Sequence, residues 1–285
     1  MVSMSQGYPI PDPAMRSAWH KWDWAAHHGD LLEAEIDRVV KADGNADSLL
    51  GIGHERDPKL ESVVVTVQSL GPFPPNISLM TGDLVQNYRS ALDHAAWFLV
   101  HQGATGGRLK ESALQRISFP IYDCREDFNN SLATKLPGVV DPHVLEVITK
   151  VQPYNATQAD KPLHALRLIR DLSNYDKHRA LHPVGLRLQS VGCKVVRKHD
   201  LAVIDINPIT PPGILEVGDK LARIFARVTG PKPHLEVGID VAGDVALSET
   251  LWIKNLIRET KVHVFRILAE FGQPPRELDP RLDGA

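Results

Sequence analysis

Apolar residues recur at every third or fourth position along residues 76–102, and this spacing predicts one long helix with a buried face. The apolar stripe consists of Leu84, Tyr88, Ala91, Ala95 and Phe98. Pro74 and Pro75 stop an extended segment from continuing into this stretch, Asn76 can cap its first turn, and Gly103 follows its end. We therefore expect the rest of the chain to be organised around this helix.

The same helical period recurs in five further stretches of the chain. They cover residues 13–42, 125–135, 141–151, 160–172 and 248–271. Asp141 followed by Pro142 is typical of a helix start, and so is Asp160 with Pro162 in the first turn. The helix that begins at Asp160 is expected to end in the polar run 173–179.

β-Branched residues and Gly or Pro turns predict strands elsewhere. Residues 61–70 have the pattern of a strand, and residues 117–122 that of a short strand or an extended segment, whereas residues 43–58 have the composition of a loop. Residues 184–241 contain several partly alternating apolar runs separated by Gly and Pro, as in a small antiparallel sheet.

Together these elements predict an α+β protein, a helical bundle of about four long helices with an antiparallel β insertion before the last helix. The expected domains are a bundle over residues 1–183, which includes the two early strands, a β-rich insertion over 184–246, the last helix over 247–272, and a disordered tail over 273–285.

Composition narrows the functional classes. The 285 residues carry a formal net charge of −3, so binding to nucleic acid must come from a local patch. Cys124 and Cys193 are the only cysteines and lack the spacing of metal ligands, which argues against a zinc site and a disulfide scaffold. We find no signal-peptide pattern and no apolar run that could span a membrane, so we expect a cytoplasmic protein without membrane contact. Nucleotide-binding and metalloprotease motifs are absent, and we expect neither a cofactor nor a bound metal.

The first candidate for chemistry is the pair Arg89 and His94, with four residues between them. Arginine can bind a phosphate through two N–H groups, and histidine can transfer a proton near neutral pH. The pair resembles the Arg-x4-6-His motif of the HEPN superfamily, helical-bundle proteins that include many metal-independent ribonucleases. This resemblance implies that Arg89 holds the scissile phosphate and that His94 is the general acid or base, often at a dimer interface.

A structural explanation of the same residues stays open. The Arg-x4-6-His spacing also occurs at Arg258/His263 and at Arg227/His234, so spacing alone does not select one pair. In this alternative, Arg89 forms an ion pair with Asp93 one helical turn later, and His94 packs beside them.

The second candidate is a dense polar cluster in the run 173–179. The side chains in it that could bind a substrate or take part in catalysis are Asn174, Asp176, Lys177, His178 and Arg179. Cations at a helix C-terminus interact favourably with the helix dipole and the free carbonyls, which explains the lysine, histidine and arginine. Capping does not explain the amide and the carboxylate in the same cluster.

The segments RSALDH (89–94) and LSNYDKHR (172–179) together resemble a group of uncharacterised bacterial and phage-borne proteins that share both. The resemblance implies that the two clusters face each other in one site. In such a site the catalytic residues would be Arg89, His94 and His178, and the substrate-binding residues Asp93, Asn174, Asp176, Lys177 and Arg179. The alternative is a buried polar network that fixes the register of the helices.

Two functional hypotheses follow. The first is a HEPN-like, metal-independent ribonuclease, or an RNA- or nucleotide-binding protein, with a role as a toxin or in phage defence. The second is a non-catalytic helical module that binds another protein or a second copy of itself, with the polar residues as a structural network. RNA cleavage in EDTA that depends on His94 or His178 would separate them.

Overall fold

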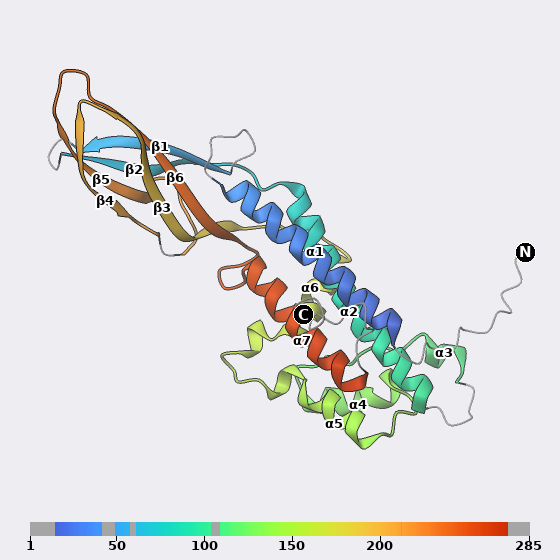
Figure 1. The fold of residues 1–285 in the computed structure, drawn as a ribbon. Helices are drawn as coiled ribbons and strands as arrows, with labels where there is room; N and C mark the ends of the chain where they lie inside the picture. Colours follow the sequence, from blue (N-terminus) through green and yellow to red (C-terminus); the bar gives the residue numbers. More distant parts are fainter. Residues whose placement is uncertain (1–14, 42–48, 58–60, 104–108, 212, 273–285) are drawn as a thin grey trace, which may run out of the picture. The chain divides into compact units, whose positions relative to one another are not determined.

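The computed structural model describes residues 15–41, 49–57, 61–103, 109–211 and 213–272. Within these ranges the chain forms seven α-helices, two single 3-10 turns and six β-strands (Figure 1). Residue contacts divide the chain into two units. The helical unit comprises Met1–Gly29, Gly82–Ala180 and Leu256–Ala285, and the sheet unit comprises Asp30–Thr81 and Leu181–Asn255.

The helical unit contains the central helix and most of the others. Its elements are the first half of α1 (Arg16–Val40), most of α2 (Pro75–Gly103), α3 (Glu111–Leu114), α4 (Arg125–Lys135), α5 (Pro142–Lys150), η1 (Pro153–Asn155), η2 (Lys161–Leu163), α6 (Ala165–Asp176) and most of α7 (Ile253–Phe271). The predicted stripe of α2 is confirmed, because every one of its five apolar side chains is buried. That stripe forms the centre of this unit's core.

Local capping explains where the shorter helices begin. Asp141 caps α5 as predicted, since its carboxylate accepts hydrogen bonds from the backbone N–H groups of His143 at 2.8 Å and Val144 at 3.5 Å. The predicted start of the next helix at Asp160 is wrong. That residue precedes only the 3-10 turn η2, and the extended backbone of His164, with ψ of 126°, separates this turn from α6.

The sheet unit contains all six described strands, and every pair of neighbours is antiparallel. One sheet has the order β1-β2-β5-β4, from β1 (Leu50–Asp57), β2 (Ser62–Leu70), β5 (Lys220–Val228) and β4 (Leu201–Pro208). The other pairs β3 (Gly185–His199) with β6 (His234–Ala246). Val65 and Val67 of β2, and Leu221 and Ile224 of β5, are buried and contribute to this unit's core.

The structure confirms an α+β protein but contradicts a bundle of about four long helices with a β insertion before the last one. Seven helices are present in the described ranges, and α6 is only 12 residues long. Strand β2 precedes α2 in the chain yet pairs with β5, with Val63 opposite Ile224, so the sheet combines segments from before and after the central helix. The predicted loop 43–58 is also wrong where β1 pairs with β2.

Three further expectations concern the segment 117–122, the C-terminal tail and the membrane. Residues 117–122 form neither a helix nor a strand. The tail 273–285, which we expected to be disordered, lies outside the described residues. Among the helices that the structure describes, none combines the length and the apolar character that crossing a bilayer requires.

Candidate functional site

Arg89 and Asp93 form the ion pair of the structural alternative. The Arg89 Nε donates to Asp93 Oδ2 at 3.1 Å, and its Nη2 lies 3.0 Å from Asp93 Oδ1. The same two side chains also hold the backbone of Phe119, because Arg89 Nη2 donates to the Phe119 carbonyl at 3.0 Å and Asp93 Oδ1 accepts from the Phe119 N–H at 2.8 Å. Both side chains are therefore committed to positioning the segment 117–122.

Two more side chains complete the support of this segment. The buried Gln152 donates from Nε2 to the Pro120 carbonyl at 2.9 Å and accepts from the Tyr122 N–H at 3.0 Å. Arg170 of α6 reaches the Ile121 carbonyl at 3.5 Å. Side chains thus provide here the hydrogen bonds that a neighbouring strand provides in a sheet.

His94 lies on a different side of α2 from Arg89. It forms a hydrogen bond with the backbone of Ser17 in α1, and its pKa is lowered, first by burial and then by the charge of Lys21. Its Nδ1 is buried without a hydrogen-bond partner. Arg89 and His94 therefore have separate partners, and the described contacts do not bring them together.

The C-terminal end of α6 packs beside α2 near Gly82 and Gln86. Gln86 Nε2 donates to the Ser173 carbonyl at 2.7 Å, and Asp176 lies against Gly82, where a Cβ atom would come within 2.5 Å of Asp176 Oδ1. Gly82 is seven residues before Arg89, so Asp176 contacts α2 about two helical turns away from Arg89.

The remaining polar residues at this end of α6 face solvent, and we call them, together with Tyr175, the α6 patch. Its members are Asn174, Tyr175, Lys177, His178 and Arg179, all of them exposed. The Arg179 guanidinium lies 5.9 Å from the centre of the Tyr175 ring, and no described carboxylate forms an ion pair with either Lys177 or Arg179. The patch is an open cationic surface with an aromatic ring, and no described contact joins it to Arg89 or His94.

A pocket of about 400 Å³ lies elsewhere in the helical unit, between α5, the start of α6 and α7. Its charged and polar lining residues are His143, Glu146, Lys150, His164, His263, Arg266 and Glu270. The apolar part of its wall consists of Val147, Val151 and Ile267. Pockets with an apolar wall and a few converging polar groups are the usual form of small-molecule and active sites.

The imidazoles of His164 and His263 meet in this histidine pocket. Their ring centres are 5.3 Å apart at an interplanar angle of 67°, and His164 Nδ1 is buried without a partner. Burial lowers the pKa of His164 to about 4, with a further contribution from His263. Burial also lowers the pKa of His263, and nearby Arg266 acts in the same direction. Both rings are therefore neutral at pH 7 and able to accept a proton.

The sequence contained part of the signal for this pair. His263 belongs to the Arg258/His263 match of the Arg-x4-6-His spacing, but the Arg258 side chain is 66% exposed and lies 3.1 Å from Glu259. His164 belongs to no motif, and only the fold brings its ring against that of His263. Among the described residues, no group of three or more His, Cys, Asp or Glu side chains is arranged to hold a metal ion.

Comparison with protein-family models, with curated proteins and with solved structures found no match to this chain.

Proposed function

We propose that the protein is a metal-independent ribonuclease whose catalytic residues are His164 and His263. The observation that supports this proposal is the pair of facing imidazoles in an open pocket that also contains Lys150 and Arg266. Phosphodiester cleavage by neighbouring 2′-hydroxyl attack needs one group that accepts a proton, one that donates a proton, and positive charge for the phosphate.

Each step of this reaction can be assigned to a residue of the pocket. His164, whose pKa is about 4, accepts the 2′-hydroxyl proton as the 2′-oxygen bonds to phosphorus. His263 in its protonated form donates a proton to the 5′-oxygen as the phosphorus–oxygen bond breaks, and the negative phosphate favours that protonated form. The products are a 2′,3′-cyclic phosphate and a 5′-hydroxyl end, and one proton has moved from His263 to RNA and one from RNA to His164.

The α6 patch is suited to hold the RNA outside the pocket. Lys177 and Arg179 are exposed cations, and Tyr175 can stack on a base, a combination that binds single-stranded nucleic acid. His164 directly precedes the 12 residues of α6 and the patch follows at the other end, a separation of about 18 Å that a few nucleotides can span. In this arrangement Arg89 and Asp93 hold the segment 117–122 and are not catalytic residues.

The test is cleavage of single-stranded RNA by the full chain in EDTA, with the products identified by their ends. We expect H164Q and H263Q each to lower the rate by about 100-fold or more, the usual contribution of a general acid or base. The matched control is H143Q, which removes an exposed imidazole at the rim of the same pocket. Absence of cleavage by the parent, or equal rates in all three variants, would refute the proposal.

A non-catalytic interaction module is the second candidate, and one observation favours it. Arg89 and Asp93, the residues of the RSALDH segment, are used to support the backbone at Phe119. In this case R89A lowers the melting temperature and the purified protein cleaves no RNA. H164Q then changes neither the melting temperature nor the binding of a partner.

A further inference from the structure

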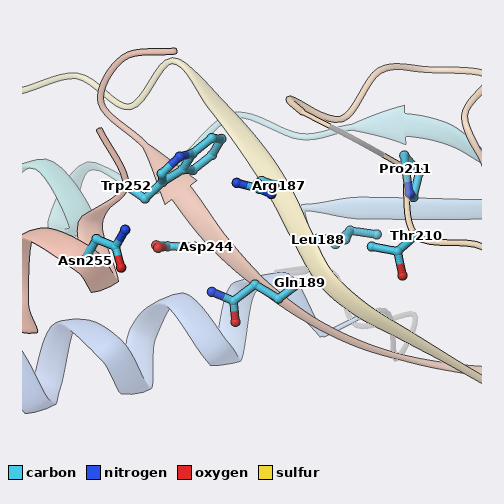
Figure 2. Close-up of a pocket in the computed structure, with 8 residues that line it drawn as sticks. All are labelled: Arg187, Leu188, Gln189, Thr210, Pro211, Asp244, Trp252 and Asn255. Carbon is cyan, nitrogen blue, oxygen red and sulfur yellow. The ribbon is translucent and has the colours of Figure 1, made fainter. Parts of the chain in front are cut away.

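A second pocket, of about 410 Å³, lies wholly within the sheet unit (Figure 2). Its lining comes from β3, β6, the residues that follow β4, and the start of α7. The lining residues used below are Arg187, Gln189, Thr210, Asp244 and Trp252. A volume of this size is within the range of pockets for small organic ligands.

Arg187 is the accessible charge of this pocket. Its guanidinium carbon lies 5.4 Å from the centre of the Trp252 ring, and Figure 2 shows the two side chains next to each other. Arg187 is exposed, and no carboxylate in the described part of the chain forms an ion pair with it. A guanidinium held against an indole keeps its N–H edge for an anion and its outer face for a second planar ring.

Asp244 is opposite Arg187 in the register of β3 and β6, but its carboxylate is used elsewhere. Both of its oxygens accept from the Lys254 N–H in the first turn of α7, at 3.1 and 3.2 Å, and Oδ1 also accepts from the Val245 N–H at 2.7 Å. The side chain is almost completely buried. Asp244 therefore caps α7, and its oxygens bind backbone N–H groups there rather than forming an ion pair with Arg187.

The neutral polar groups of the pocket stand near this cation. Gln189 is the extra residue of a β-bulge, since Leu188 pairs with Gly243 and Ser190 with Ala242 while Gln189 has no partner. A bulge of this kind changes the direction of a side chain and is frequent beside binding sites. Gln189 and Thr210 are both exposed, so an amide and a hydroxyl are available to a ligand.

We infer that this pocket binds a nucleoside monophosphate, with the phosphate on the N–H edge of Arg187 and the base stacked on its outer face. Such a ligand combines the anion and the planar ring that Arg187 on Trp252 can accept, and its base edge has donors and acceptors for the Gln189 amide. The inference uses no residue of the histidine pocket and does not depend on the proposed ribonuclease activity.

The experiment is isothermal titration calorimetry of the full chain with AMP, CMP, GMP and UMP, and with inorganic phosphate and the free nucleosides as partial ligands. We expect at least one monophosphate to bind more tightly than either of its parts. R187Q should weaken that binding by about tenfold or more, because it removes the charge-assisted hydrogen bonds to the phosphate. The matched control is R197Q, on the same strand but outside the pocket, where Arg197 is 81% exposed.

A second variant tests the stacking part of the inference. R187K keeps the positive charge but removes the planar guanidinium, so it should keep phosphate binding and lose the additional affinity for the monophosphate. The inference is overturned if the parent binds no monophosphate, if inorganic phosphate binds as tightly as the monophosphates, or if R187Q and R197Q bind alike. Melting temperatures of the variants show that each is folded.

Discussion

The buried imidazole of His164 predicts a specific dependence of stability on pH. Its pKa is about 4 in the folded protein and 6.5 in an ordinary environment, and burial is the main cause. A lowered pKa means that the folded state favours the neutral ring, so this contribution to stability is complete above pH 6.5 and is lost as the pH falls through 4. Each unit of pKa shift is equivalent to about 1.4 kcal/mol, so the shift of His164 from 6.5 to about 4 contributes about 3 kcal/mol to the free energy of unfolding. Solvent in the open pocket reduces it to about 2 kcal/mol.

Urea denaturation followed by circular dichroism at pH values from 7.5 to 4 measures this contribution. The parent should lose about 2 kcal/mol more of its free energy of unfolding across this range than H164Q, which has no ionisable group at this position. The control is L163Q, which introduces the same side chain at the neighbouring exposed position and leaves His164 in place. If H164Q loses stability with falling pH as steeply as the parent and L163Q do, the ring is not buried as the structure describes.

Three further predictions concern activity and stability. RNA cleavage should have a bell-shaped pH profile with its maximum between about 4 and 6.5, because one pocket histidine must be neutral and the other protonated. R89A should lower the free energy of unfolding in urea by about 3 kcal/mol, because it leaves a carboxylate and the Phe119 carbonyl without their partner. G82A should change the free energy of unfolding by less than about 1 kcal/mol in the same assay, because the Asp176 carboxylate must move away from the added methyl, and it should stabilise by about 1 kcal/mol in a D176A background, where that contact is absent.

Each of these predictions has a clear contrary result. A cleavage optimum above pH 8 would exclude a protonated histidine as the acid. For Arg89, the comparison is R197A, which removes an exposed ion pair with Glu236 and should cost less than about 1 kcal/mol; equal losses would show that the Phe119 contacts contribute nothing. For Gly82, alanine is the better helix former by about 1 kcal/mol, so an equal gain from G82A with and without Asp176 would show that Asp176 does not pack there.

Periodicity predicted the parts of the fold that depend on local sequence. The α2 stripe and the Asp141 cap of α5 were found because spacing and capping act within a few residues. Strand β1 was missed because Gly51 and Gly53 weaken its strand pattern, and its conformation depends on pairing with β2. The start of α6 was missed because Pro162 is compatible with a 3-10 turn as well as with an α-helix.

The candidate site could be predicted only in part. The exposed cations at the end of α6 were visible in the sequence because they are neighbours in the chain. His164 and His263 are far apart in the sequence, and their contact depends on the packing of α6 against α7, which no local pattern encodes. Arg89 and His94 are close in the sequence, but the helical geometry gives them different neighbours. The resemblance of the RSALDH and LSNYDKHR segments to uncharacterised proteins stays a prediction.

The support of residues 119–122 by side chains has a consequence for the order of folding. A strand in a sheet can form its ladder one peptide at a time, but the amide of Phe119 can be protected only after α2 has presented Asp93 and tertiary docking has brought the two segments together. Deuterium exchange at that single amide therefore reports the docking of the segment on the central helix, and in D93A, which removes the accepting oxygen, it should become fast while the amides inside α2 stay slow.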